Sequence, residues 1–363
     1  MKRIFALVLA LMLLLCGCGG GAAETSAPTT VTETSVPETT VPETTAPPET
    51  TVPDATAPAS VDTNPLTGEA LDEVTNLRPT AIMINNLVKA VPQCGIGQAD
   101  MLYEILAEGS VTRFMAIFSD PSQVDVIGPV RSVRPYFVRV AQHYDAILSS
   151  AGGSDGAYDL ISSLNYDYLN AIAGAGGYFY RDAWRKENRG YEHSLMTTGE
   201  KLTAAAKNSG VDTTLEDFTN YGLLFDDSAI PAGTDVSQLD IHFYEGGKLT
   251  RMTHDPETNL YTMYQHGNTA VDANNDEPLT FRNVVVLFAT TRIIDNKGHL
   301  EVQMTGEGEG YFARDGKLIP IYWSRESNDD LYTYTDVAGE PIVFGVGKTY
   351  VAIVPTGSNI DIE

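Results

Sequence analysis

Basic residues are scarce in this sequence. Its 363 residues include 23 Lys and Arg against 48 Asp and Glu, which gives a formal net charge of -25. Binding to the phosphate backbone of a nucleic acid needs a basic face, so this charge argues against nucleic acid as a partner. It also argues against electrostatic adsorption to anionic lipid. A charge of this sign favours solubility and self-repulsion.

Motifs for common chemistry are also missing. No two of the six histidines stand at metal-ligand spacing, so the sequence predicts no metal site, and no motif indicates a cofactor. The nucleophile motif Gly-x-Ser-x-Gly is absent. The segment from Ala151 to Gly156 is rich in glycine but lacks the lysine and the spacing of a phosphate loop. Because Gly152, Gly153 and Ser154 would join a strand to a helix, they stay candidates for a ligand-binding turn.

The first 17 residues have the features of a secretory signal peptide. Lys2 and Arg3 precede an apolar run over residues 4–15, which is about 18 Å of helix and too short to span a bilayer comfortably. Residues 15–18, Leu-Cys-Gly-Cys, resemble a bacterial lipobox, which implies cleavage before Cys18 and lipidation of Cys18. The alternative is an ordinary cleaved signal or a short anchor helix. We therefore expect a protein attached through lipid to the outer face of the bacterial cytoplasmic membrane.

Cysteine is rare, since the chain has three. Cys16 would leave with the signal peptide, and Cys94 is the only free thiol that remains if Cys18 carries lipid. No intramolecular disulfide is then possible. Cys94 has no basic neighbour closer in sequence than Lys89, which favours a buried or loop residue over a nucleophile.

Residues 18–62 consist mainly of Thr, Pro, Glu, Ala, Val and Ser, and Val-Pro-Glu-Thr-Thr recurs at a five-residue spacing. Such a composition cannot bury enough apolar surface to offset its chain entropy, so we expect a disordered tether with polyproline character. If extended, it would reach on the order of 100 Å. That length would lift a folded part off the membrane and into the cell wall.

The folded part is expected in two domains, an α/β domain over residues 63–228 and a smaller, mainly antiparallel β domain over residues 229–363. In the first, apolar runs predict strands at 80–85, 111–118, 146–150 and 192–197. Helices are expected at 98–107, after Ser132, at 154–164, and from Thr198 to Gly210. This alternation indicates a mostly parallel sheet covered by helices. In the second, short period-two runs separated by turns such as 245–248, 295–298 and 314–317 indicate antiparallel strands.

An arginine-rich loop, residues 128–135, precedes one of the expected helices. Ser132 is a suitable N-cap, and Arg131 and Arg134 flank a helix N-terminus that carries partial positive charge. With Arg113 and Arg181 from the same arginine-rich stretch, this loop could bind a carboxylate or phosphate. The alternative is that the arginines pair with acidic side chains of the chain itself.

Candidate acid and base groups are few. Asp100, Glu104 and Glu108 recur every four residues, so they would share one face of the expected 98–107 helix. That face could supply acid/base carboxylates, but it could equally be a solvated helix face on which Arg113 pairs with one of the acids. His193 is a candidate general base or oxyanion ligand, and a single histidine is more often structural.

Several motifs together are similar to those of one bacterial family. They are Asn85-Asn86, Gln98-Ala99-Asp100, Tyr103-Glu104, Glu108-Gly109, Thr112-Arg113-Phe114, residues 128–135, Ala151-Gly152-Gly153-Ser154, Phe179-Tyr180-Arg181-Asp182, Val271-Asp272-Ala273, residues 283–286 and residues 347–350. The set resembles the YerB-like lipoproteins, a family catalogued under a domain of unknown function. This resemblance covers most of the folded chain and implies an envelope lipoprotein with an α/β domain and a smaller C-terminal domain, without an assigned activity. Asn85 stands where the family is expected to have Asp, which weakens any catalytic carboxylate there.

Three hypotheses for the function follow. The first is a lipid-anchored envelope protein that is not an enzyme and binds an anionic ligand or a wall component. Its candidate ligand-binding residues are Arg113, Arg131, Ser132, Arg134, Gly152, Gly153, Ser154, Arg181, Asn85, Asn86 and Asp100. The second is a hydrolase of wall glycan or peptide that uses Glu104, Glu108 or His193. The third is a scaffold whose β domain docks another envelope protein.

Overall fold

The structure is a computed structural model that describes residues 63–72, 75–215, 220–228 and 230–363. The expected signal peptide, the lipidation site Cys18 and the Thr/Pro/Glu-rich tether lie outside the described residues. Within the described part, no helix is both long enough and apolar enough to cross a membrane.

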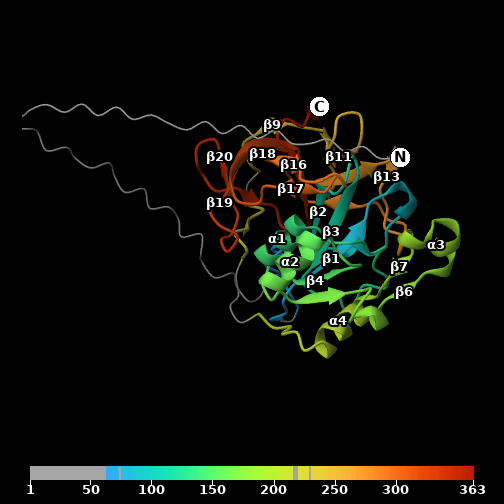
Figure 1. Cartoon of the computed structure of the whole chain (residues 1–363). Helices are drawn as coiled ribbons and strands as arrows, with labels where there is room; N and C mark the ends of the chain where they lie inside the picture. The colour runs from blue at the N-terminus through green and yellow to red at the C-terminus, as the bar shows by residue number, and fades with distance from the viewer. Residues whose placement is uncertain (1–62, 73–74, 216–219, 229) are drawn as a thin grey trace, which may run out of the picture. The chain divides into compact units, whose positions relative to one another are not determined.

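A large mixed sheet forms the centre of the described part (Figure 1). Its strands lie in the order β20-β19-β18-β15-β22-β2-β3-β1-β4-β5, and β9 pairs with β19. Their bounds are β1 Thr80–Asn85, β2 Met101–Leu106, β3 Thr112–Phe118, β4 Ile147–Ser150, β5 Tyr168–Asn170, β9 Thr234–Asp235, β15 Asn283–Ala289, β18 Gly306–Arg314, β19 Lys317–Arg325, β20 Thr333–Asp336 and β22 Thr349–Pro355.

Both parallel and antiparallel pairs occur in this sheet. The pairs β1–β4, β4–β5, β2–β22 and β15–β22 are parallel, and β2–β3 and β1–β3 are antiparallel. Strand β22 comes from the C-terminal end of the chain, yet it lies between β2 and β15 and is buried almost throughout. Hydrogen bonds of one sheet therefore join the N-terminal and C-terminal halves of the folded chain.

A second, antiparallel sheet has the order β13-β12-β11-β10-β23, with β14 paired to β12. Its bounds are β10 Gln238–His242, β11 Leu249–Asp255, β12 Leu260–Gln265, β13 Asn268–Thr269, β14 Thr280–Phe281 and β23 Ile360–Ile362. Burial alternates along β12 between buried and half-buried residues, so one face of this strand packs on the core and the other is partly exposed. The expected fold class, an α/β part followed by an antiparallel β part, is confirmed.

The helices and remaining strands lie around these sheets. The α-helices are α1 Pro135–His143, α2 Asp155–Ser163, α3 Ala183–Asn188 and α4 Gly199–Asn208. The short strand pairs are β6 Tyr180–Arg181 with β7 Leu195–Met196, β8 Leu224–Phe225 with β21 Val343–Phe344, and β16 Thr291–Ile293 with β17 Leu300–Val302. The 3-10 turns are η1 Val88–Ala90, η2 Ile96–Gln98, η3 Gly176–Tyr178 and η4 Tyr191–His193.

Two local predictions are correct because the capping chemistry is strong. Ser154 caps α2 through a hydrogen bond that its Oγ accepts from the N–H of Ala157 at 3.3 Å. Thr198 caps α4 in the same way, accepting from the N–H of Lys201 at 3.1 Å. Each side-chain oxygen satisfies one of the backbone donors that a helix start leaves unpaired.

Three other local predictions are wrong. Residues 98–107 hold the end of η2 and strand β2 instead of a helix, because β2 is buried along its whole length between β22 and β3. Ser132 does not cap α1: its Oγ donates to the carbonyl of Ala151 at 2.9 Å, and Arg134 is the N-cap, with Pro135 as the first helical residue. The expected strand at 192–197 is reduced to β7, preceded by η4.

Gly199, the first residue of α4, lies directly against the backbone of Pro121. A Cβ at this position would be 1.6 Å from the carbonyl oxygen of Pro121 and 2.7 Å from its carbon. Since backbone must move to admit the methyl group, we expect Gly199→Ala to lower the free energy of unfolding by about 1–3 kcal/mol. Gly177→Ala is the matched control, because a Cβ there meets nothing within 4 Å. Urea unfolding of both variants tests this, and equal stability of the two would contradict the described packing.

Candidate functional site

The arginines of the 128–135 loop lie close together, but the chain's own groups occupy them. Arg113 donates to Glu108 Oε2 at 2.8 Å and to the carbonyl of Ser132 at 2.8 Å, and Arg134 pairs with Glu108 Oε1. Burial, helped by the nearby Arg134, lowers the pKa of Arg113 to about 10, and Glu108 opposes this shift. Glu108 is thus a shared counter-ion of two buried guanidinium groups, as the alternative interpretation anticipated for Arg113.

The other two arginines of this set are also occupied. Arg131 pairs with Glu192 at 3.0 Å. Arg181 lies in the 180–191 segment, donates to the carbonyl of Tyr191 at 2.6 Å and stacks on the Tyr191 ring at 3.8 Å. None of these four arginines lines any of five cavities found over the described residues.

The remaining predicted ligand residues fill structural positions. Gly152 has a positive φ of 74° and its carbonyl accepts from the N–H of Val133 at 2.9 Å, while Gly153 forms a bridge to the same residue. Asp100 accepts from Asn64 Nδ2 at 2.8 Å and from the N–H of Ser119 at 2.6 Å, and burial raises its pKa. Their polar groups therefore have partners within the chain.

His193 is a buried residue of η4 and lies against Asn85. Asn85 Nδ2 is 2.9 Å from His193 Nδ1. An amide nitrogen only donates, so Nδ1 accepts and the imidazole is neutral with its proton on Nε2. Burial lowers the pKa of His193, with Glu192 acting in the opposite direction. This arrangement leaves no accessible basic nitrogen, since Nδ1 is used and the ring is 3 % exposed.

Glu104 has no exposed surface and is surrounded by donors. Its Oε1 accepts from Asn86 Nδ2 at 2.9 Å and from the Thr112 hydroxyl at 2.6 Å. Its Oε2 accepts from the hydroxyl of Thr250 at 2.8 Å and from that of Tyr350 at 2.7 Å. A carboxylate saturated in this way cannot approach a substrate, so the geometry does not support a hydrolase that uses Glu104.

The fifth partner of Glu104 is the ammonium group of Lys248. Lys248 Nζ is 3.4 Å from Glu104 Oε1 and also donates to Gln265 Oε1. The side chain of Lys248 is 5 % exposed. Its burial lowers its pKa below the ordinary value, and Glu104 opposes that shift. Lys248 lines a cavity, whereas Glu104 lies behind it and is not among the lining residues.

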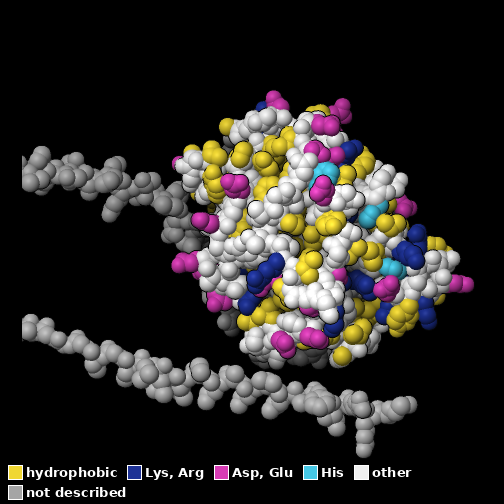
Figure 2. All heavy atoms as spheres, turned by 45° about the horizontal axis from the view of Figure 1, so that its top comes forward, with side chains coloured by type: hydrophobic (Ala, Val, Ile, Leu, Met, Phe, Trp, Pro, Cys, Tyr) yellow, Lys and Arg dark blue, Asp and Glu magenta, His cyan; other side chains and the backbone are white. Residues whose placement is uncertain are grey.

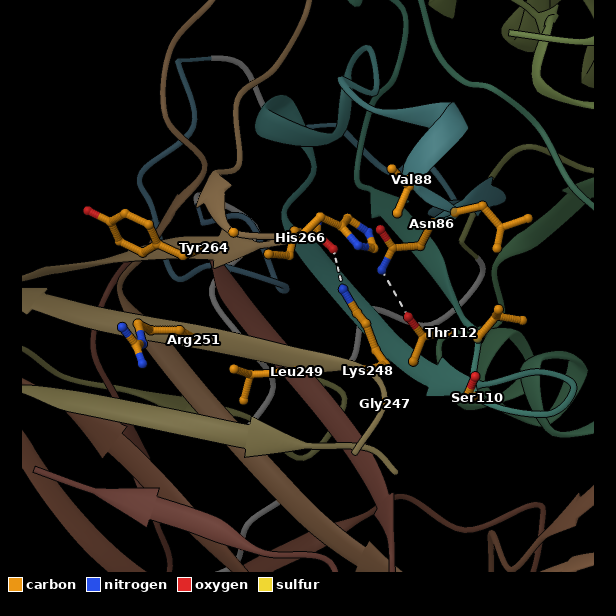
Figure 3. A pocket seen from close by; sticks show the side chains of 14 residues that line it. Asn86, Val88, Ser110, Thr112, Gly247, Lys248, Leu249, Arg251, Tyr264 and His266 are labelled. Atoms are coloured by element: carbon orange, nitrogen blue, oxygen red, sulfur yellow. Dashed lines mark hydrogen bonds between the residues drawn. The ribbon is translucent and has the colours of Figure 1, made fainter. Parts of the chain in front are cut away.

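The cavity has a volume of about 580 Å³, within the range of small-molecule sites. Figure 3 shows Asn86, Thr112 and Lys248 gathered at one end and Arg251 with Tyr264 at the other. Its lining residues are Asn86, Leu87, Val88, Ser110, Val111, Thr112, Gly247, Lys248, Leu249, Arg251, Tyr264, Gln265, His266 and Gly267. No carboxylate is among them, although the chain carries 48 acidic residues.

Arg251 is the more accessible cation of this cavity. Its guanidinium donates to both oxygens of Asp240 at 2.6 Å, and its side chain remains 42 % exposed. The Asp240 side chain is only 11 % exposed. Nε2 of His266, a further lining residue, is buried without a hydrogen-bond partner. Of the two cations of the cavity, Arg251 faces solvent and Lys248 is almost fully buried. The carboxylates that pair with them, Asp240 and Glu104, are not among the lining residues.

Sequence reasoning identified Asn86 and Glu104 but missed the rest of this site. From the sequence, Lys248 is expected only within the turn at 245–248, and Arg251, Tyr264 and Gln265 are not among the candidate ligand-binding residues. The turn at 245–248 does hold a signal for a cavity. Two glycines precede Lys248, and because they have no side chains they leave space beside the lysine. In the described part of the chain, no group of three or more His, Cys, Asp or Glu could hold a metal ion.

Comparison with known proteins places this chain in a family. The model of the N-terminal domain of a protein of unknown function, DUF3048, matches residues 66–212, and that of the DUF3048 C-terminal domain matches residues 239–351. The chain belongs to the DUF3048 family. The Bacillus subtilis (strain 168) protein named "Putative lipoprotein YerB" is 32% identical to it over 293 residues, which cover 80% of this chain and 86% of YerB.

The crystal structure of YerB has the same fold as this DUF3048 protein. The two superpose with a TM-score of 0.72 at 30% identity, over 82% of this chain and 99% of the YerB chain. The expected resemblance to the YerB-like lipoproteins is thus confirmed. In this DUF3048 protein, Asn86 and Thr112 belong to the N-terminal family region, and Lys248, Arg251 and Tyr264 belong to the C-terminal one. The cavity therefore lies where the two regions meet.

Proposed function

We propose that this DUF3048 protein is a lipid-anchored protein of the cell envelope that binds a small anionic molecule in the cavity of Lys248 and Arg251. The observation that carries the binding proposal is the absence of any carboxylate from the lining of a cavity with two cations, in a chain of net charge -25. An anion entering this site meets unlike charge, whereas most of the acidic surface would repel it.

The chemistry of the lining suggests a sugar-like or otherwise hydroxylated anion. Ser110, Thr112, Asn86 and Gln265 supply hydroxyl and amide groups, and Tyr264 supplies an aromatic ring. A guanidinium recognises a carboxylate or phosphate through paired hydrogen bonds. We place the ligand here because Lys248 and Arg251 line this cavity. The side chains of Arg113, Arg131, Arg134 and Arg181 line none of the five cavities found over the described residues.

Isothermal titration calorimetry with three related sugars tests the binding proposal. N-acetylmuramic acid and N-acetylglucosamine 1-phosphate carry a carboxylate and a phosphate, and N-acetylglucosamine is the neutral control. We expect at least one anionic sugar to bind at least 10-fold more tightly than the neutral one. Arg251→Gln should weaken that binding, whereas Arg131→Gln should leave it unchanged. Failure of both anions to bind, or equal loss in the two variants, would contradict the proposal.

The lipid anchor is supported by the lipobox-like residues 15–18 and by the lipoprotein name of the relative YerB. If the anchor is attached at Cys18, mass spectrometry of the mature protein should find an N-terminal cysteine with a diacylglycerol mass. Cys18→Ala should move the protein from the membrane fraction to the soluble fraction. A Cys18→Ala protein that is still acylated would contradict this part of the proposal.

A further inference from the structure

An exposed group of aromatic and basic side chains covers α3 and η4. Trp184 is 59% exposed and Tyr191 is 62% exposed, which makes them two of the most exposed large hydrophobic side chains in the described residues. Arg181 and Lys186 lie over the Tyr191 ring at 3.8 and 5.9 Å, and Arg189 lies 5.5 Å from the Trp184 ring. We call these five residues the α3 patch.

The α3 patch is held rigidly on the protein. Asp182 caps α3 by accepting from the N–H of Arg185 at 2.7 Å. The buried Arg185 side chain donates to the carbonyl of Ala90 at 2.9 Å and to that of Pro92. Arg185 thereby fixes α3 to the loop after β1. The exposed rings consequently belong to a fixed surface and do not lie on a loose end of the chain.

The patch differs in charge from the chain around it. Figure 2 shows Lys and Arg side chains concentrated toward the right of the molecule, the side on which Figure 1 places α3. Of the acids in the same segment, Asp182 is used as a cap and Glu192 pairs with Arg131. Glu187 is the exposed acid that remains on α3. Residues 181–192 thus carry four basic and three acidic side chains, a slight basic excess in a chain of net charge -25.

We propose that the α3 patch docks the folded part of this protein on an anionic lipid surface. Trp and Tyr have an apolar ring with a polar edge and prefer the boundary between lipid and water, and Lys and Arg pair there with phosphate headgroups. The proposal rests on the lipid anchor proposed above, because the anchor keeps the patch at high effective concentration near the membrane. Weak contacts by five side chains are then sufficient to orient the protein.

The two tryptophans of the chain make this docking measurable. Trp184 is exposed, whereas Trp323 is 2% exposed in the core and is an internal reference. The lipidated full-length mature protein is reconstituted into vesicles of phosphatidylcholine alone or of phosphatidylcholine with 30% phosphatidylglycerol. Co-flotation with the vesicles reports the anchor, and quenching of tryptophan fluorescence by acrylamide, which is neutral and is not repelled by anionic lipid, reports the environment of Trp184.

We expect equal co-flotation with both vesicle types but quenching at least 2-fold weaker on the anionic vesicles. The triple variant Arg181→Gln, Lys186→Gln, Arg189→Gln should float normally and lose this protection, and Glu187→Gln should increase it. Trp184→Phe should remove the quenchable fluorescence, which would assign that fluorescence to Trp184. Equal quenching of the wild-type protein on both vesicles, with normal flotation, would overturn the docking proposal. Loss of flotation from both vesicle types would overturn the anchor, and with it the docking that rests on it.

Discussion

Glu104→Gln is expected to lower the free energy of unfolding by about 3–5 kcal/mol, because it leaves a buried ammonium group without its counter-charge. Lys248 Nζ would retain Gln265 as a neutral acceptor, and the amide that replaces the Glu104 carboxylate carries no charge to balance the ammonium group. Lys248→Met should cost less, since Glu104 would keep four neutral donors, from Asn86, Thr112, Thr250 and Tyr350. The double variant should recover part of the loss caused by Glu104→Gln, because no charge is then left unbalanced.

Urea unfolding of the three variants measures these differences, with Arg292→Gln as the control. Arg292 pairs with Glu301, but the two side chains are 70% and 55% exposed, so we expect less than about 1 kcal/mol from its loss. A Glu104→Gln protein as stable as the Arg292→Gln protein would show that the buried pair does not join the two family regions as described.

Acid should destabilise this protein partly through His143. The ring of His143 is buried in α1, with ring centroids 4.5 Å from Tyr144 and 5.1 Å from Tyr332. Burial, helped by Arg325, lowers the pKa of His143 from 6.5 to about 3. In the unfolded chain His143 therefore binds a proton below pH 6.5, whereas in the folded protein it binds one only below about pH 3. The contribution of His143 to stability is complete above pH 6.5 and is lost progressively as the pH falls through this window.

His143→Phe preserves an aromatic ring and removes the titration. Between pH 7 and pH 4.5 the stability of the wild-type protein should fall by about 2–3 kcal/mol more than that of the variant, at 1.36 kcal/mol per pH unit below the ordinary pKa. Urea unfolding at both pH values gives this difference. Because other acidic groups titrate equally in the two proteins, parallel pH profiles would contradict the described burial of His143.

The sequence predicted the fold best where local chemistry and tertiary structure agree. Ser154 and Thr198 cap helices because their side chains satisfy nearby backbone donors. Residues 98–107 match a helical period although they contain strand β2, because a strand buried on both faces has no polar alternation to distinguish it. Its pairing with β22, almost 250 residues later, decides the outcome.

The candidate site could not be predicted from the sequence for the same reason. Asn86, Thr112 and Lys248 come from separate strands and turns and meet only when both family regions pack together. Conversely, Arg113 and Arg134 are clustered in the fold as expected, but Glu108 neutralises both. Clustering of like charges predicts proximity, whereas availability to a ligand depends on counter-ions that the folded chain supplies.

The location of bound anion tests the central claim most directly. Backbone amide shifts of deuterated, ¹⁵N-labelled protein are recorded while N-acetylmuramic acid is added, with N-acetylglucosamine as the neutral reference. The account predicts shifts specific to the anion at Ser110, Gly247, Lys248 and Gly267, which line the cavity. Shifts confined to residues 131–134 and 152–154 would contradict it, since the ligand would then occupy the arginine-rich loop and displace the carboxylates that hold it.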